Sequence, residues 1–465
     1  IRIQKTNTYK NIEHTTKQKV IKPLLATATS RKPYALALMV IVFVTSSLLF
    51  LNDERTIEAA TATWTQTDWS GGVGTSTTNQ YTSSSNLTES TDLTLTATGS
   101  WYNSNWGYRK AIVIDNTKVS GSVDLTNFVA LVSATSTDWK SVSNGGNVTQ
   151  ADGGDIVFTN SSGTKLDHEI DLYTASTGNL IAWVEIDTLE YDADTTIYMY
   201  YGNDAGSLDE SSATGTWSGY SAVWQMSEEP TTASAAVLDS TSNNYDLTGV
   251  TVGANDWSGT ELIDGKINKA IQFNDNYLQI VDTPITEEDY TVSAWVKVEE
   301  TPDNLGPGIF SQNSTGDAYG FQGAIKSGTI SDYINGGALS GSGGLDDHTV
   351  WNYLTWGLEP TGDIHYLLIN GVNVRNTGTA NAPAATLKFN VGSWRGHQNF
   401  RNLTGEMDHM TISPFRTDDW VATEYANQNA PETFSSEGTE ESQYSTSGEL
   451  ISASFDTGEA TSLFS

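Results

Sequence analysis

Residues 404–413, TGEMDHMTIS, alternate polar and apolar side chains as a β-strand does. Successive side chains on a strand point to opposite faces, so Glu406 and Asp408 are expected on one face, roughly 7 Å apart. This spacing is close to that of the carboxylate pair of glycoside hydrolases. The stretch is therefore either the catalytic strand of a sugar-cleaving enzyme or the closing strand of a domain that only binds.

The composition around this stretch indicates an all-β protein with two or three domains. A chain of 465 residues exceeds one ordinary domain. Only 37% of the residues are hydrophobic, but 14 Trp and 20 Tyr supply large side chains for β-sandwich cores with polar outer faces. The chain has no cysteine, so neither disulfides nor thiol chemistry contribute.

The charge is divided unevenly along the chain. Residues 1–62 carry 9 Lys/Arg against 4 Asp/Glu, and the remainder carries 14 against 52, a net charge of −38. Such a body repels nucleic acid and anionic membrane surfaces, so nucleic acid is not expected as a partner. Its acids either bind divalent cations or serve solubility.

An apolar segment near the N-terminus predicts export. Residues 34–51, YALALMVIVFVTSSLLFL, are 18 uncharged residues that extend about 27 Å as a helix, enough to cross a bilayer core. The basic segment 1–33 precedes them, so the positive-inside rule predicts a cytoplasmic N-region and a body outside the cell or on its surface. Ala60-x-Ala62 suits signal cleavage. A cleaved signal peptide and a retained membrane anchor both remain open.

Low-complexity segments flank the expected domains. Residues 52–105 are rich in Thr, Ser, Asn and Gly and predict a linker or partial β module, and 206–220 predict a second linker. YTSSSNLTESTDLTLTATG (81–99) resembles YSTSGELISASFDTG (444–458) within the terminal spacer, 435–465. The two are either copies of one module, the second truncated as in a fragment of a longer protein, or similar spacers.

Residues 106–205 predict a first β-sandwich. Six short runs of β-branched and aromatic residues are separated by Gly/Asn/Asp/Ser clusters. WGYRKAIVI (106–114), DIVFTNSSGTKLDHEID (155–171) and TTIYMYYGN (195–203) resemble a domain of unknown function found on archaeal and bacterial surface proteins. The resemblance implies an all-β extracellular module and nothing catalytic.

Residues 221–434 predict a second sandwich. SAVWQMSE (221–228), YTVSAWVKVEE (290–300), IHYLLINGVNV (364–374) and LTGEMDHMTISPF (403–415) follow the order of laminin-G-like jelly rolls. This resemblance implies the concanavalin A-like lectin and glucanase fold, in which two curved antiparallel sheets pack face to face. The predicted fold class is thus two consecutive antiparallel β-sandwiches after an N-terminal transmembrane or signal helix.

The jelly-roll resemblance answers the opening question against catalysis. Laminarinase-like members carry Glu-x-Asp-x-x-Glu on one strand, whereas here Thr411 replaces the third acid. A hydroxyl cannot protonate a glycosidic oxygen near neutral pH. Laminin-G-type jelly rolls end in Phe-x-Gly-x-Ile-Asp-Glu-Val-Arg, which Gly405, Met407 and Asp408 match, with His409 in place of the Glu. No enzyme activity is therefore predicted, and Asp408 either anchors the strand or ligates a structural cation.

Calcium is the cofactor that these acids predict, because it takes oxygen ligands from carboxylates, amides and carbonyls. Four residues occupy positions resembling those that hold calcium in some jelly rolls: Glu228, Asp239, Asn243 and Asp408. For Asp239 an Asx-turn that needs no metal is an equal alternative.

The loop SWRGHQNFR, 393–401, predicts the ligand site. Aromatic faces stack on sugar rings, and Arg and His donate hydrogen bonds to hydroxyl or acidic groups. The predicted binding residues are Trp394, Arg395, His397, Phe400 and Arg401. The alternative is that Trp394 and Phe400 pack the core, as most aromatic residues of β proteins do.

Together these features predict an exported cell-surface protein that acts in adhesion or in binding an extracellular glycan or surface protein. Two alternatives remain: a glycoside-active enzyme whose catalytic domain is outside this sequence, and a purely structural envelope or filament component.

Overall fold

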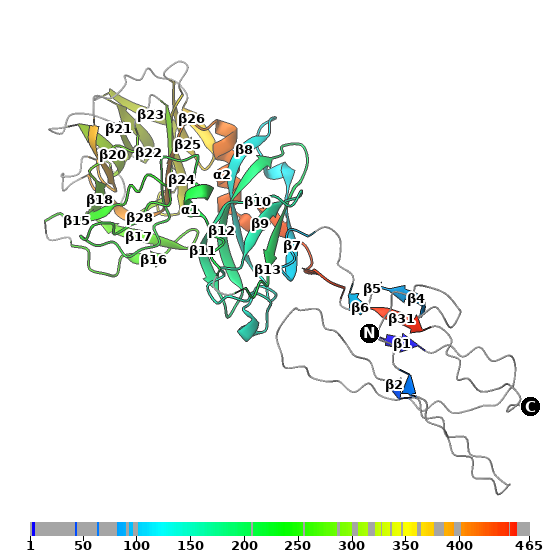
Figure 1. The fold of residues 1–465 in the computed structure, drawn as a ribbon. Helices are drawn as coiled ribbons and strands as arrows, with labels where there is room; N and C mark the ends of the chain where they lie inside the picture. The colour runs from blue at the N-terminus through cyan, green and yellow to red at the C-terminus, as the bar shows by residue number, and fades with distance from the viewer. Residues whose placement is uncertain are drawn as a thin grey trace, which may run out of the picture. The chain divides into compact units, whose positions relative to one another are not determined.

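The computed structural model contains a body, residues 108–440, and a smaller unit built from residues 1–107 and 441–465 (Figure 1). The residues that the structure describes are 2–4, 42–43, 63–64, 81–89, 93–95, 101–205, 208–253, 256–285, 289–299, 306–314, 321–326, 328–334, 337–345, 347–359, 364–375, 386–394, 401–445 and 447–452.

In the smaller unit, the two stretches that look alike in sequence pair with each other. Strand β4 (Tyr81–Ser85) is antiparallel to β31 (Glu449–Ser452), which also pairs in parallel with β1 (Arg2–Gln4). Leu450 of β31 is fully buried. The similar stretches therefore contribute to a single sheet. The other strands of this unit are β2 (Val42–Phe43), β3 (Thr63–Trp64), β5 (Leu87–Glu89), β6 (Leu93–Leu95) and β30 (Glu441–Ser442).

The predicted transmembrane or signal helix at 34–51 lies outside the described residues, apart from the short strand β2. Among the helices that the structure describes, none has the length and apolar character needed to cross a bilayer.

The first sandwich of the body packs two antiparallel sheets. The β7 sheet has the strand order β10-β9-β13-β7-β29, and the β12 sheet has the order β11-β12-β8. Their bounds are β7 (Tyr108–Ile114), β8 (Leu125–Thr135), β9 (Val157–Asn160), β10 (Lys165–Leu166), β11 (His168–Thr174), β12 (Asn179–Leu189), β13 (Thr195–Tyr201) and β29 (Ser435–Glu437), with the short helices η1 (Asn116–Lys118) and η2 (Val142–Asn144).

Strand β12 is apolar on both faces. Leu180 and Val184 lie in the core between the two sheets, whereas Ile181 and Trp183 lie in a second cluster on the outer face. A strand buried on both faces has a continuous apolar run rather than an alternating one, as in NLIAWVEI. The outer face of the β12 sheet is therefore an internal surface of the body.

The motif residues of the first sandwich hold its loops together. The buried Asp155 carboxylate accepts hydrogen bonds from the N–H groups of Thr149, Gln150, Gly202 and Asn203, at 2.9–3.2 Å. A carboxylate that accepts several N–H groups is stabilised without a counter-ion. The Tyr-Tyr-Gly-Asn ending of β13 thus has a structural role.

The second sandwich is a jelly roll of two antiparallel sheets. The β28 sheet has the order β16-β17-β28-β19-β24-β25-β26, with β14 also on β28, and the β20 sheet has the order β15-β18-β27-β20-β21-β22-β23. The bounds in the β28 sheet are β14 (Ala222–Trp224), β16 (Leu262–Asp264), β17 (Lys269–Asn274), β19 (Tyr290–Val298), β24 (Asn352–Glu359), β25 (Ile364–Ile369), β26 (Val372–Arg375) and β28 (Thr404–Ser413). Those in the β20 sheet are β15 (Thr248–Val250), β18 (Tyr277–Ile280), β20 (Gly308–Ser314), β21 (Phe321–Lys326), β22 (Thr329–Ile334), β23 (Gly337–Gly344) and β27 (Thr386–Val391).

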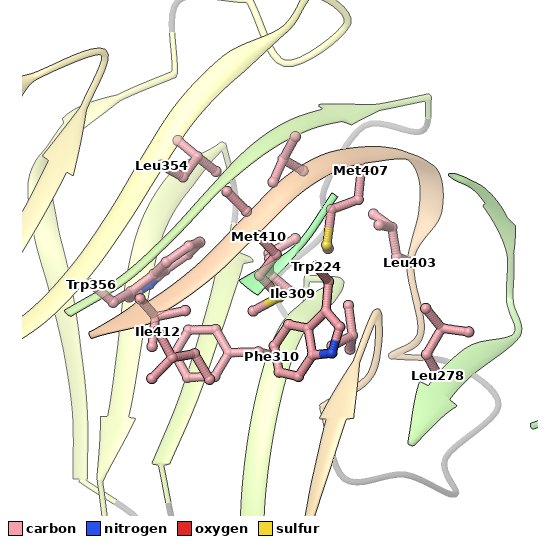
Figure 2. Packing of buried hydrophobic residues seen from close by; sticks show 14 of the residues in the cluster. Trp224, Leu278, Ile309, Phe310, Leu354, Trp356, Leu403, Met407, Met410 and Ile412 are labelled. Atoms are coloured by element: carbon pink, nitrogen blue, oxygen red, sulfur yellow. The ribbon is translucent and has the colours of Figure 1, made fainter. Parts of the chain in front are cut away.

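The jelly-roll core fills the space between these sheets. Figure 2 shows Trp224 and Met410 from the β28 sheet packed with Phe310 and Leu278 from the β20 sheet. Each of these side chains is fully buried. The prediction of an all-β protein is confirmed, since the described helices in the body beyond residue 144 are α1 (Ala213–Thr216), α2 (Asp418–Asn429) and α3 (Pro431–Phe434).

After the jelly roll the chain returns to the first sandwich. Phe434 is fully buried in the first core, and β29 pairs with β7, with Ser435 opposite Ile114 and Glu437 opposite Ile112. The jelly roll is thus inserted between β13 and β29. Residues 435–465 are predicted to be a spacer, but Ser435–Glu437 form a strand of the first sandwich, because pairing with a distant strand leaves no local pattern.

Candidate functional site

Strand β28, the opening stretch of the sequence analysis, contains a β-bulge. Met407 and Met410 are three residues apart, yet both point into the jelly-roll core (Figure 2). The register against β19 shifts at this point, and His409 has a φ of 42°. A bulge places two consecutive residues opposite one on the partner strand. Asp408 and His409 therefore both face outward, which strict alternation does not predict.

Asp408 is fastened to the backbone on the outer face of the β28 sheet. Its Oδ2 accepts the N–H of Ile267 at 2.8 Å, and the side chain is 1% exposed. A Cβ on Gly265 would lie 2.6 Å from this oxygen, so only glycine leaves room for it. Burial raises the pKa of Asp408, and the nearby Asp171 acts in the same direction, while backbone N–H groups oppose both.

His409 contacts the first sandwich directly. Its ring stacks on Trp183 of β12, with centroids 4.2 Å apart and planes 13° apart. Its Nδ1 lies 2.8 Å from Oε1 of Gln225 in the jelly roll. Burial lowers the pKa of His409 to about 3, so the imidazole is neutral. We call this contact surface between the sandwiches the junction.

Glu169 of β11 gathers donors at the junction. Its carboxylate accepts hydrogen bonds from Nε2 of Gln225 at 3.0 Å and from Oγ of Ser240 at 2.8 Å, both from the jelly roll. It also accepts the indole N–H of Trp217, between the domains. Three donors on one carboxylate form a strong, directional contact.

Asp171, two residues further along β11, makes a similar contact. It accepts Oγ of Ser227 at 3.1 Å and Nδ2 of Asn268 at 3.0 Å. Burial raises the pKa of Asp171 to about 6 and that of Glu228 to about 7. Side-chain hydrogen bonds thus join the first sandwich to two separate segments of the jelly roll.

The two carboxylates of β28 are not arranged as an acid pair. Glu406 forms an ion pair with Lys297 at 2.7 Å, and the buried Asp408 accepts the N–H of Ile267. A retaining glycosidase needs two carboxyl groups on either side of an accessible bond. The structure supports the interpretation of β28 as a closing strand.

Three of the four residues predicted for calcium, Asp239, Asn243 and Asp408, have other partners, whereas Oε2 of Glu228 is buried without a hydrogen bond. Both Asp239 oxygens accept hydrogen bonds, from the N–H groups of Val223, Thr241 and Tyr245 at 2.9–3.0 Å and from the Thr241 hydroxyl at 2.8 Å. This is the Asx-turn alternative. Asn243 is exposed and donates to the Ser221 carbonyl. Within the described ranges, no three His, Asp or Glu side chains are placed to hold a metal ion together. Calcium binding stays a prediction.

The predicted ligand loop is described only at its ends. Trp394 is 4% exposed, and the Arg401 guanidinium carbon lies 4.6 Å from the centroid of its ring. The ends are joined by a hydrogen bond of 2.6 Å from Ser393 to Asn402. Burial of Trp394 agrees with the core-packing alternative for this residue. Arg395, His397 and Phe400 lie outside the described residues, so their role stays a prediction.

A row of polar side chains on the β20 sheet was not predicted. Gln279, Asn390, Ser311 and Gln322 are opposite one another on four neighbouring strands and face away from the core. Gln279 donates to Asn390 at 2.7 Å, and Asn390 donates to Ser311 at 3.1 Å. The alternation in YLQI and KFNV is the signal that could have identified this row.

Comparison with solved structures gives partial likenesses to binding domains. Domain 4 of AbnA, an extracellular GH43 arabinanase from Geobacillus stearothermophilus solved with arabinotriose, is 19% identical over 44% of this chain and 98% of that one, with a TM-score of 0.36. The CBM40 of the Ruminococcus gnavus IT-sialidase, solved with α2,3-sialyllactose, is 12% identical over 33% and 94%, with a TM-score of 0.29.

A third likeness is to the binding domain of Paraclostridial Mosquitocidal Protein 1, 16% identical over 45% of this chain, with a TM-score of 0.34. The matched part spans about half of that domain, 52%. No curated protein matches the chain.

Family models match both sandwiches. Residues 152–228 match the family described as Domain of unknown function (DUF2341), and residues 272–422 match Laminin_G_3, of the concanavalin A-like lectin/glucanases superfamily. The chain therefore contains a DUF2341 domain followed by a concanavalin A-like domain.

Proposed function

We propose that the protein is a non-catalytic binding module of the cell surface, in which the jelly roll binds an extracellular glycan or a surface protein. The observation that carries this proposal is that both acids of β28, Glu406 and Asp408, already have partners within the protein. This strand closes a domain of the lectin and glucanase superfamily, but its two acids are engaged by Lys297 and by the N–H of Ile267. A domain of this fold whose β28 acids are engaged in this way can bind a glycan, but these acids cannot cleave it.

The ligand is proposed to bind away from the β28 sheet. On the outer face of that sheet, Trp295, Tyr353 and His409 are at most 2% exposed. The polar row of the β20 sheet is closed in the same way, since Ser311, Gln322 and Asn390 are at most 1% exposed, so the proposed binding segment is the loop 393–401. Amide, guanidinium and imidazole groups donate hydrogen bonds to hydroxyl and carboxylate groups, which suits an oxygen-rich glycan.

Glycan-array binding of the full chain tests this proposal. The matched pair of variants is Arg395→Ala/His397→Ala in the loop 393–401 and Glu190→Ala/Asp192→Ala, exposed acids of the first sandwich. We expect the loop variant to lose at least about tenfold in affinity, the cost of one or two charge-assisted hydrogen bonds, and the control to retain binding. Equal binding by both variants would show that Arg395 and His397 do not bind the glycan.

The same preparation tests the enzyme alternative. We expect no release of reducing sugar from glucans by the wild type. Hydrolysis by the wild type that disappears in Glu406→Gln would overturn the proposal of a non-catalytic module.

The proposed location rests on the apolar run at 34–51 and on the acidic body that follows it. Sequencing the N-terminus of the mature protein from the membrane and medium fractions separates the two alternatives. A start near Thr63 in the medium indicates a cleaved signal, and an uncut chain in the membrane fraction indicates an anchor. Recovery of the intact chain from the cytosol alone would contradict export.

The proposal of a structural calcium ion can be tested by measuring the melting temperature with and without calcium. If Glu228 and Asp408 contribute to a calcium site, adding calcium to chelator-treated protein raises the melting temperature, because a ligand that binds only the folded state stabilises it. An unchanged melting temperature would contradict the proposed calcium site.

A further inference from the structure

Helix α2 is a polar helix that is buried on two sides. It begins after Thr417, whose hydroxyl accepts the N–H of Trp420. Figure 1 shows it between the jelly roll and β8 of the first sandwich. Its buried residues include four with polar side chains, Thr423, Glu424, Asn427 and Gln428. Such a helix is not held by an apolar stripe, so its position depends on individual polar contacts.

One set of contacts reaches the first sandwich. Asn427 accepts the backbone N–H of Leu131 at 2.6 Å and donates to the carbonyl of the same residue at 2.9 Å. Strand β8 is the edge of the β12 sheet, so none of the described strands pairs with Leu131 on that side. The amide of Asn427 takes the place of a strand. Thr423 adds a second contact by accepting the N–H of Ser120 at 2.9 Å.

An aromatic contact completes this set. Trp420 packs against Phe128 of β8 with ring centroids 5.3 Å apart, and both side chains lie in the core of the first sandwich. Trp420, Thr423 and Asn427 are three and seven residues apart along the helix and so lie on one side of it.

The other set of contacts reaches the jelly roll. Glu424 accepts the hydroxyl of Tyr353 at 3.1 Å, and Gln428 accepts the indole N–H of Trp295 at 2.8 Å. Val421 packs in the same cluster as these two aromatic rings. One helix thus contacts both domains through different residues. Thr423 and Asn427 contact the first sandwich, and Glu424 and Gln428 contact the jelly roll.

We propose that the first sandwich is an orienting platform whose β8 edge recognises a helix with Trp, Thr and Asn at positions 1, 4 and 8. In this chain the partner is the C-terminal helix of the jelly roll, and the contact fixes the jelly roll in one orientation. This assigns a role to a domain of unknown function, and it holds whatever ligand the jelly roll binds.

Two independent anchors support a fixed orientation rather than a loose contact. Helix α2 binds the β8 edge of the β12 sheet, and Glu169 on β11, the opposite edge, holds Gln225 and Ser240. Trp183 on the central strand β12 lies under His409. Contacts at both edges and in the middle of one sheet remove the freedom to rotate about any single contact.

Single-molecule energy transfer in the full chain tests the proposal. The protein has no cysteine, so Ser161→Cys in the first sandwich and Val281→Cys in the jelly roll, both exposed, accept one dye pair. We expect one narrow distribution for this protein. Asn427→Leu/Glu169→Ala, which removes an anchor at each edge, should broaden or split it, while the control Asn429→Leu/Glu190→Ala, at exposed positions, should not.

Hydrogen exchange at Leu131 supplies a readout at the contact itself. Asn427→Asp keeps an acceptor for the Leu131 N–H, whereas Asn427→Leu removes it, and each variant changes one residue and leaves the Glu169 anchor in place. We expect exchange of the Leu131 amide to be about tenfold faster in Asn427→Leu than in Asn427→Asp. A narrow distribution in the double variant, or equal exchange in the two single variants, would overturn the proposal.

Discussion

The two outer faces of the jelly roll have different fates. On the β28 sheet, the outer face carries four buried residues: Trp295 and Tyr353 contact α2, His409 stacks on Trp183 of the first sandwich, and Asp408 accepts the N–H of Ile267. On the β20 sheet, the outer row of amides and hydroxyls is hydrogen-bonded within the sheet itself. The jelly roll therefore uses the outer face of the β28 sheet to contact α2 and the first sandwich, whereas the polar row of the β20 sheet bonds within its own sheet. Four measurements can break or sharpen this difference.

The largest effect is expected from Trp183→Ala at the junction. Trp183 is fully buried and contacts both His409 and Trp217. Removing a buried aromatic side chain costs about 3–5 kcal/mol in the free energy of unfolding. Urea denaturation measures it, with Tyr191→Ala as the control, because Tyr191 is 36% exposed and should cost about 0.5 kcal/mol. Similar losses in the two variants would mean that the junction contributes little.

Acid should weaken the junction through His409. Its pKa is lowered to about 3 in the folded protein, whereas that of an unfolded histidine is near 6.5. The unfolded chain binds the proton first, so the free energy of unfolding falls as the pH drops from 6.5 towards 3. At pH 4.5 the loss from this residue reaches about 2.5 kcal/mol. His409→Gln should remove it, and parallel stability curves for the two proteins between pH 7 and pH 4.5 would contradict this account.

A smaller loss is expected on the other face from Asn390→Ala. The substitution removes the acceptor for Gln279 and the donor to Ser311. Leaving such partners unsatisfied costs about 1–2 kcal/mol. Urea denaturation should place this variant between the wild type and Trp183→Ala. A loss as large as that of Trp183→Ala would show that the two faces contribute equally to stability.

The smallest effect is expected from Glu406→Gln on β28. The side chains of Lys297 and Glu406 are 31% and 12% exposed, and partly solvated ion pairs contribute no more than about 1 kcal/mol. The difference from the wild type should shrink in 0.5 M salt, roughly three times the physiological ionic strength. A loss above that of Asn390→Ala would indicate that this ion pair has a further role.

The strands and their order could be predicted from the sequence because they depend on local alternation. IAWVEI and TTIYMYY each have the β-branched and aromatic content of a strand, and both are strands. The Asx-turn at Asp239 was also open to prediction, since an Asp followed by Thr and Asn is a local signal. The choice of a closing strand over a catalytic one followed from Thr411 in place of the third acid and from the match of Gly405, Met407 and Asp408 to the laminin-G ending.

The junction could not be predicted from the sequence because its contacts join distant segments. The bulge at Asp408 and His409 becomes apparent only when β28 is paired with β19. Helix α2 contacts its partners through Thr, Glu, Asn and Gln, so no apolar stripe marks its buried sides. One signal was present: the unbroken apolar run of β12 implies a second covered face.

Because β29 pairs with β7, the two ends of the body lie close together. Its first strand starts at Tyr108, and its last segment runs back beside that strand, with the Gly438 N–H bound to the Ala111 carbonyl and Glu437 paired with Lys110. Residues 108–440 could therefore be spliced into a surface loop of a carrier protein without separating the ends of that loop. A phage coat or a fluorescent reporter could then display the whole two-domain body on a double tether.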